Sequence, residues 1–150
     1  MFVMSEQLKD KRGLCRFFSR HRPLQFTRFM CSISSSEKLL QHWMIYFMYD
    51  DDTVLECEGV CDSDSSKLVG NARLRPYSDI KSLEKDMQFL DYGPCLPKEI
   101  ITNQVDNMNL TSKPYNVLNN NCWHWIKALL SALDARQALA AFTSSSNCKK

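Results

Sequence analysis

The chain has 150 residues, which is enough for one domain with its own core and too short for two domains of ordinary size. Hydrophobic residues make up 44% and charged residues 24%, the usage of an ordinary globular protein. Basic and acidic side chains nearly balance, and the net charge of +2 is too small to supply a broad field for nucleic acid. We therefore expect one soluble domain without a nucleic-acid partner.

The seven cysteines do not predict a disulfide framework, because their number is odd and their spacing is irregular. A signal peptide is not expected, since Glu6, Lys9 and Asp10 interrupt the first residues before an apolar segment can form. The longest nearly uncharged apolar run, residues 43–49, is far shorter than the roughly 20 residues that span a bilayer. These patterns favour a reducing, cytoplasmic location with free thiols.

Basic residues are concentrated in the first 28 positions, where they outnumber acidic residues and alternate with phenylalanines. We expect residues 1–23 to form a basic, flexible arm. A mitochondrial presequence and an arm that contacts a membrane surface are the alternatives. The early acidic residues count against the presequence, whereas the phenylalanines leave peripheral membrane contact open. The basic residues are Lys9, Lys11, Arg12, Arg16, Arg20, Arg22 and Arg28.

The next part of the chain is typical of β-structure. Aromatic and β-branched residues predict a strand over 24–33, which a serine-rich loop ends. Two runs of strand formers separated by three aspartates predict a β-hairpin over 42–60. A polar loop follows, and then another strand is expected over 68–74.

Helical spacing dominates the remainder. The sequence predicts a helix over 78–90, stopped by a Gly-Pro pair, and a second helix over 98–108. Three asparagines that can cap a helix precede Cys122, and apolar residues recur after it at helical spacing. A third, buried helix is therefore expected to begin close to Cys122, with room to continue over 135–141. Residues 143–150 are expected to form a mobile tail.

Cys122 is the leading candidate for a nucleophile. In the first turn of a helix, unpaired backbone N–H groups and the positive end of the helix dipole favour a thiolate. The same N–H groups can hold the oxyanion of a tetrahedral intermediate. The alternative is a buried structural cysteine on an apolar helix face.

His42, at the start of a predicted strand, is the candidate base, because an imidazole there can reach the end of a packed helix. His124 is the competitor, but two residues along a helix turn it about 200° away from Cys122, so we expect it to pack or to form hydrogen bonds. Strand alternation places Glu56 and Glu58 on one face, and either can orient the imidazole, since the turn does not fix the register.

These residues carry a resemblance to a known family. The run His42-Trp43 at a strand start, an acidic residue after a short hairpin, and Asn121-Cys122-Trp123-His124-Trp125 far downstream resemble the lecithin:retinol acyltransferase-like family. That family is a circularly permuted relative of papain-like cysteine enzymes and uses an Asn-Cys-x-His-Phe helix start. The match covers roughly residues 24–133, with Trp125 in place of the usual phenylalanine.

The resemblance implies a permuted papain-like α+β domain over residues 24–142, in which an antiparallel sheet packs against a helix with the nucleophile at its N-terminus. It implies that Cys122 accepts an acyl group and that His42 is the base, while Glu56 falls where the family usually has a second histidine. The expected activity is acyl transfer or hydrolysis, including phospholipase action, on an acyl-lipid or an acyl-peptide substrate, without a cofactor or metal.

Three alternatives stay open. A permuted papain-like thiol isopeptidase of the PPPDE type, which removes ubiquitin-like modifiers, also resembles residues 115–125. An interaction module could keep the fold without the activity. A zinc site is the third, although its spacing matches no strong template; its ligands would be Cys57, Cys61, Cys122 and His124.

Overall fold

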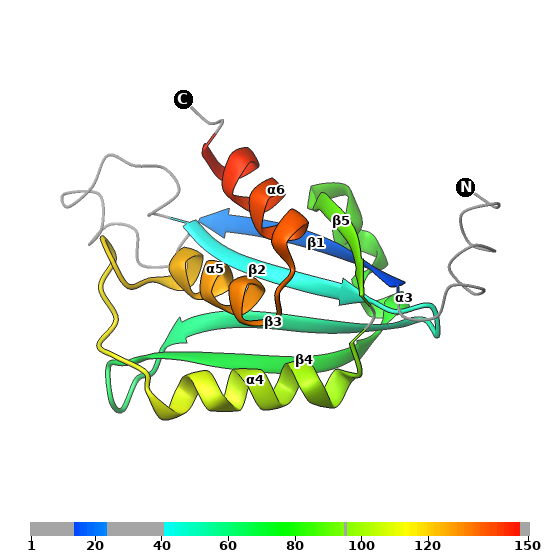
Figure 1. Cartoon of the computed structure of the whole chain (residues 1–150). Coiled ribbons are helices and arrows are strands. Elements are labelled where there is room, and N and C mark those ends of the chain that lie inside the picture. The colour runs from blue at the N-terminus through cyan, green and yellow to red at the C-terminus, as the bar shows by residue number, and fades with distance from the viewer. Residues whose placement is uncertain (1–13, 24–40, 95, 148–150) are drawn as a thin grey trace.

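The computed structural model describes residues 14–23, 41–94 and 96–147 of the chain (Figure 1). Within these ranges, five strands form one antiparallel sheet in the order β4-β3-β2-β1-β5. Four α-helices and one 3-10 helix accompany the sheet, so the protein is α+β as predicted. In chain order, the elements are β1 (Leu14–Pro23), β2 (Gln41–Met48), β3 (Thr53–Cys61), β4 (Leu68–Pro76), α3 (Tyr77–Ile80), η2 (Lys81–Asp86), β5 (Gln88–Pro94), α4 (Lys98–Leu110), α5 (Cys122–Ala132) and α6 (Arg136–Asn147).

The β2–β3 hairpin lies in the middle of the sheet. Every residue from 43 to 49 is buried, which explains why this run is continuously apolar instead of alternating. In the turn, the Thr53 N–H donates to the Asp51 carboxylate at 3.2 Å. Asp52 adopts a φ of 65°, a left-handed conformation that aspartate tolerates better than most residues. The hairpin predicted over residues 42–60 is thereby confirmed.

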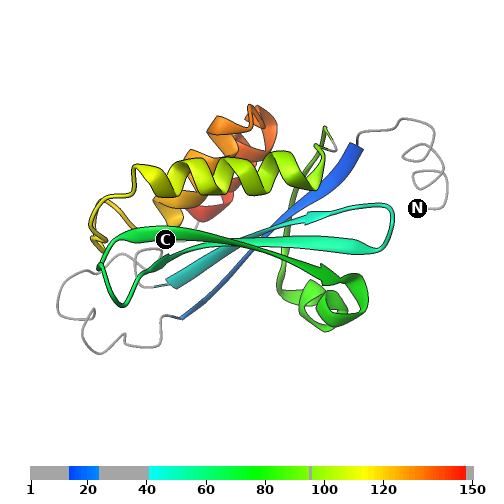
Figure 2. The same cartoon turned by 90° about the horizontal axis from the view of Figure 1, so that it is seen from below.

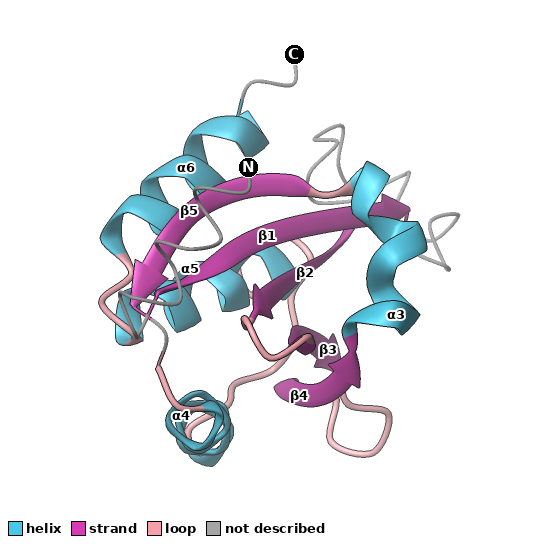
Figure 3. Cartoon of the chain, turned by 90° about the vertical axis from the view of Figure 1, so that its right-hand side faces the viewer, coloured by secondary structure: helices cyan, strands magenta, loops and turns pink. Residues whose placement is uncertain are grey.

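The two faces of the sheet bury different side chains. On β2, Trp43 and Ile45 belong to the main core, which the helices α4, α5 and α6 cover. Met44 and Tyr46 point the other way and share a smaller core with Ile80 of α3. Figures 2 and 3 show α4, α5 and α6 on one side of the sheet and α3 on the other. The second face of the sheet therefore has its own, smaller core, which α3 covers.

The sequence prediction was wrong about the start of the domain. Residues 14–23, expected to belong to the flexible arm, form β1, which pairs with β2 and β5 inside the sheet. Phe17 and Phe18 are buried on opposite faces of β1, in the main and the smaller core respectively. The sequence analysis missed this strand because basic residues lie between its apolar residues. The strand expected over 24–33 lies outside the described residues.

The helix predicted over residues 78–90 is also corrected. Helical structure ends with η2 at Asp86, and Gln88 begins β5, whose backbone pairs with β1 at the edge of the sheet. The helical spacing of Ile80 and Leu83 is nevertheless used, because both pack in the smaller core. Tertiary pairing with β1 therefore overrides the local helical period after η2.

The last helical segment is divided in two. Helix α5 ends at Ala132, and Asp134 follows with a φ of 59°, which turns the chain. Helix α6 then packs back, so that Phe142 lies edge-on to Trp43 with ring centroids 5.4 Å apart. Residues 143–147, expected in the mobile tail, belong to α6.

Trp125 of α5 lies against two glycines that face each other across β3 and β4, Gly59 and Gly70. A β-carbon on Gly59 would come within 2.6 Å of the Trp125 Cγ atom, and a β-carbon on Gly70 would overlap the outer ring of the indole. The two glycines therefore leave the space on the sheet that the Trp125 indole fills.

We predict that Gly70→Ala lowers the free energy of unfolding by about 1–3 kcal/mol, because the added methyl group overpacks the indole. Trp125→Phe, which removes the outer ring, should recover part of that loss. Gly59→Ala is the matched control: it meets Cβ and Cγ of Trp125, which phenylalanine retains, so Trp125→Phe should not rescue it. Urea denaturation of the single and double variants measures these differences. Equal rescue of both glycine variants would contradict this packing.

None of the helices in the described part of the chain combines the length and the apolar character needed to cross a membrane.

Candidate active site

Helix α5 begins at Cys122, and its start is fixed by hydrogen bonds from the residue before it. The Asn121 side chain accepts from the backbone N–H groups of Trp123, at 3.0 Å, and of His124, at 3.2 Å. The Asn121 N–H in turn donates to the His124 ring, which completes a capping box. Asn121 also donates from its amide to the Val117 carbonyl at 2.6 Å. Cys122 is therefore held in the first turn of a rigid helix.

His124 thus forms part of the cap, as the sequence indicated when it placed this residue away from the Cys122 face. The zinc alternative has no support in the ranges that the structure covers, where no three His, Cys, Asp or Glu side chains gather so that they could hold a metal ion. Cys57, one of its four ligands, lies in the main core, where burial and then the charges of the neighbouring glutamates raise the pKa of its thiol to about 12.

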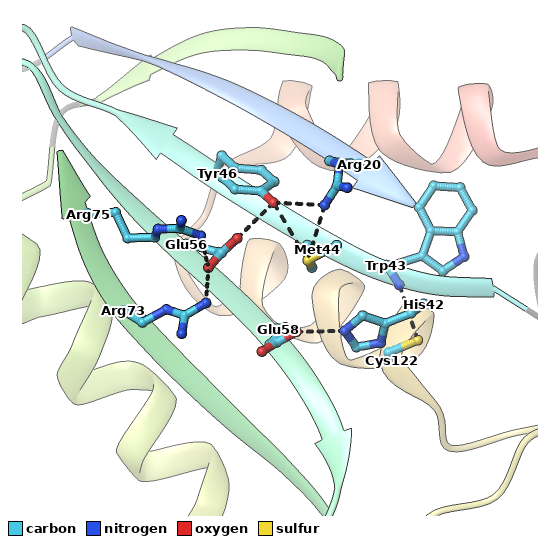
Figure 4. Close-up of polar contacts among 10 residues, drawn as sticks. All are labelled: Arg20, His42, Trp43, Met44, Tyr46, Glu56, Glu58, Arg73, Arg75 and Cys122. Atoms are coloured by element: carbon cyan, nitrogen blue, oxygen red, sulfur yellow. Dashed lines mark hydrogen bonds and ion pairs between the residues drawn. The ribbon is translucent and has the colours of Figure 1, made fainter. Parts of the chain in front are cut away.

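The Cys122 sulfur lies against the start of β2. The Trp43 N–H donates to Cys122 Sγ at 3.4 Å, which joins two residues 79 positions apart in the sequence (Figure 4). The β2–β3 pairing ends at Met44 and Glu58, and beyond this pair β2 continues along β1 while β3 continues along β4. Where the two strands separate, the first turn of α5 meets the β2 backbone. Cys122 is buried, with 2% of its surface exposed.

The His42 imidazole lies between Cys122 and Glu58 (Figure 4). Its Nε2 atom is 2.6 Å from Glu58 Oε1. Burial alone would lower the pKa of His42, but hydrogen bonds to Cys122 and Glu58, together with their negative charges, outweigh it and raise this pKa to about 9. The imidazole therefore carries a proton at neutral pH. A positive charge therefore lies beside the Cys122 sulfur, at the N-terminus of α5.

The partner of His42 is Glu58 and not Glu56, the residue to which the family resemblance pointed; the sequence itself had left both glutamates open. The register pairs Glu58 with Met44 and Glu56 with Tyr46, so Glu58 is the nearer glutamate to the start of β2. Glu56 is buried and accepts a hydrogen bond from the Tyr46 hydroxyl at 2.8 Å. Its other oxygen accepts from two arginines of β4. The register, which the sequence left open, decides between the two glutamates.

The two arginines are Arg73, at 2.7 Å from Glu56 Oε1, and Arg75, at 3.3 Å. Burial raises the pKa of the Glu56 carboxyl, but these arginines and the Tyr46 hydroxyl outweigh burial and hold the pKa below its ordinary value. Glu56 is therefore a charged residue within an ionic network, and its carboxylate is fully engaged away from His42.

Tyr115 is a site residue to which the sequence analysis gave no role. Its hydroxyl forms hydrogen bonds with the Cys122 thiol and with the Cys122 backbone. Burial, then the negative charge at Cys122, raises the pKa of this hydroxyl, so it stays protonated and can donate. The Tyr115 N–H donates to the Ser66 carbonyl at 2.8 Å, which anchors the loop before α5. No periodicity marks such a residue; its only signal is its place just before the capping asparagines.

The pKa of His42 predicts how each glutamate affects stability. A group whose pKa rises from 6.5 in the unfolded chain to about 9 in the folded protein stabilises the fold below pH 6.5, and this contribution is lost as the pH rises through 9. We therefore expect Glu58→Gln to lower the free energy of unfolding by about 1–3 kcal/mol at pH 6 and by much less above pH 9.

Glu56→Gln is the matched control on the same strand. Its partners are arginines, which stay charged, so its cost should persist above pH 9. Because the pKa of Glu56 is lowered, that cost should shrink as the pH falls below the pKa of the unfolded carboxyl, and it should be lost below the lowered pKa of the folded one. Denaturation at pH 6 and at pH 9.5 compares the stability cost of the two substitutions below and above the pKa of His42. Parallel pH profiles for the two variants would show that Glu58 does not hold the charged imidazole.

The chain matches no family model, and comparison with curated proteins and with solved structures gave no match. The arrangement of Cys122, His42, Glu58 and Tyr115 is therefore the basis on which a function is assigned.

Proposed function

We propose that the protein is a cysteine-dependent acyltransferase or hydrolase with a permuted papain-like fold, similar to the lecithin:retinol acyltransferase-like family, and that it acts through an acyl-Cys122 intermediate. The observation that carries the proposal is the meeting of Cys122, at the N-terminus of α5, with an imidazole whose other side is bound to Glu58. In chain order, the strand that carries the histidine precedes the helix that carries the cysteine. This order supports the permuted arrangement.

In the proposed first step, the Cys122 thiolate attacks the carbonyl carbon of an ester, thioester or amide. The carbonyl oxygen becomes negative, and its proposed donors are the Cys122 N–H and the Tyr115 hydroxyl, which bond each other before a substrate binds. The protonated His42 then gives its proton to the leaving group as the carbon–oxygen, carbon–sulfur or carbon–nitrogen bond breaks. The products are acyl-Cys122, the protonated leaving group and a neutral imidazole.

In the second step, the neutral His42 removes a proton from water, an alcohol or an amine while that acceptor attacks the thioester. Collapse of the intermediate releases the acyl product and restores the thiolate beside a protonated imidazole. Glu58 stabilises the imidazolium and holds the ring in place, the role that the third residue has in other triads. The resting imidazole is thus already charged, and attack needs no prior proton transfer.

The test is formation of an acyl adduct. Purified protein incubated with a short-chain phospholipid or an activated ester should gain the mass of one acyl group, and Cys122→Ala should not gain it. Cys61→Ala is the matched control, because Cys61 is an exposed thiol that has no role in the proposed mechanism. An adduct that persists in Cys122→Ala would remove Cys122 from the mechanism.

Two further experiments with the purified protein distinguish the alternative functions, an isopeptidase and an inactive interaction module. Labelling of Cys122 by a ubiquitin-like vinyl sulfone probe, without an acyl adduct from lipid or ester, would replace this proposal by the isopeptidase. For an interaction module without activity, iodoacetamide at neutral pH should modify Cys122 no faster than Cys61. The enzyme proposal requires faster alkylation at Cys122, since the thiolate is the reactive form.

A further inference from the structure

The end of β3 lies beside the start of α5. Cys61 is the last residue of β3, and Cys122 is the first residue of α5. The loop before α5 is attached to the β3–β4 turn, since the Tyr115 N–H donates to the Ser66 carbonyl at 2.8 Å. Figure 1 shows the end of β3 and the start of α5 at the same end of the sheet. The two cysteines therefore belong to elements that meet there.

Cys61 and Cys122 also lie on the same face of the sheet. Cys61 pairs across the ladder with Leu68 of β4, and directly opposite residues of paired strands share a face. Leu68 and Cys122 both belong to the main core, on the side that α5 covers. Cys61 is exposed at the end of its strand, whereas only 2% of the surface of Cys122 is exposed. An exposed thiol therefore lies on the face that carries the buried candidate nucleophile.

The contact of Trp125 with Gly59 sets how closely α5 approaches β3. The Trp125 β-carbon lies 2.7 Å from the position that a β-carbon on Gly59 would take. From this contact, Cys122 is three residues back along α5, about 4.5 Å, and Cys61 is two residues forward along β3, about 7 Å. Both steps lead toward the same end of the sheet. The two cysteines are thereby brought close to the separation of about 3.5–4.5 Å between β-carbons that a disulfide needs.

Tyr115 supports this arrangement. Burial, then the negative charges of Cys122 and of Cys61, raises the pKa of the Tyr115 hydroxyl. The hydroxyl that bonds Cys122 therefore also lies near Cys61.

We propose that Cys61 is the resolving partner of Cys122, and that the two cysteines form a reversible disulfide when a hydroperoxide oxidises the candidate site. The inference rests on the proposed function for the reactivity of Cys122, and it adds a modification that blocks this nucleophile. A reactive thiolate with a second thiol beside it is the arrangement that makes cysteine oxidation reversible. Because Cys61 is exposed, a soluble thiol can reach the disulfide and reduce it.

In the first step, the Cys122 thiolate attacks hydrogen peroxide, a sulfur–oxygen bond forms and the oxygen–oxygen bond breaks. The sulfur loses two electrons, and the leaving hydroxide takes the proton of His42 and becomes water. In the second step, the Cys61 sulfur attacks the sulfenic sulfur of Cys122, so that the disulfide forms and the sulfur–oxygen bond breaks. The proton of the Cys61 thiol leaves with the hydroxide as a second water.

The first test maps the disulfide. Hydrogen peroxide, equimolar with the reduced protein, should give a cross-linked peptide that contains Cys61 and Cys122, detected by mass spectrometry after the remaining thiols are blocked. Cys61→Ser should instead accumulate the Cys122 sulfenic acid, which dimedone traps, to a level roughly tenfold above that of the unmodified sequence. Cys57→Ala, which removes a buried thiol from the same strand and face, is the matched control and should leave the cross-link unchanged. Oxidation of Cys122 without this cross-link, or a cross-link from Cys122 to a different cysteine, would overturn the proposal.

The second test measures reversal and does not need an acyl adduct. After excess peroxide and then dithiothreitol, the unmodified sequence should regain free Cys122, counted by alkylation and mass spectrometry. Cys61→Ser should regain roughly tenfold less, because a sulfinic acid is not reduced by thiols. A cross-link that forms although no acyl adduct does would uphold the disulfide while the proposed function fails. Equal recovery in the two proteins would overturn the disulfide even if the acyl adduct forms.

Discussion

The candidate site depends on one junction, at which the backbone N–H of Trp43 meets the sulfur of Cys122. Each side of this junction is fixed independently. Asn121 holds the first turn of α5 through its side chain, and the Trp43 indole is buried against Phe142 of α6. His42 is the residue before Trp43, so its position beside the sulfur follows from the same contact. Two segments far apart in the sequence are thereby held in one geometry.

The two faces of the sheet bury different kinds of side chain. The face toward α5 is apolar and provides the core, whereas the opposite face combines a small core under α3 with the ionic network of Glu56 and the His42–Glu58 pair. Burying charged groups is favourable only when each has partners, and here each glutamate has its own cation. The alternation of β3 places Glu56 and Glu58 on one face, and the register gives them different partners.

Much of the fold could be predicted from the sequence, because its signals are local. The hairpin over 42–60, and a helix that starts near Cys122, follow from turn residues, capping asparagines and helical spacing. The meeting of His42 with Cys122 is a tertiary property, which the predicted strand start and helix start made possible and the resemblance to a family made specific. The choice of Glu58 depends on register, and Tyr115 comes from a loop without periodicity. The strand β1 was missed because its apolar residues are interleaved with basic ones, which average to the composition of a solvated arm.

The central claim is that His42 is charged because it lies between Cys122 and Glu58, and titration of its ring nitrogens by NMR tests this most directly. The account predicts that the imidazole stays protonated at neutral pH and titrates near pH 9. Cys122→Ala should lower this value, because it removes a hydrogen bond and a negative charge beside the ring. A titration near the ordinary histidine value of about 6.5, unchanged by Cys122→Ala, would contradict the account.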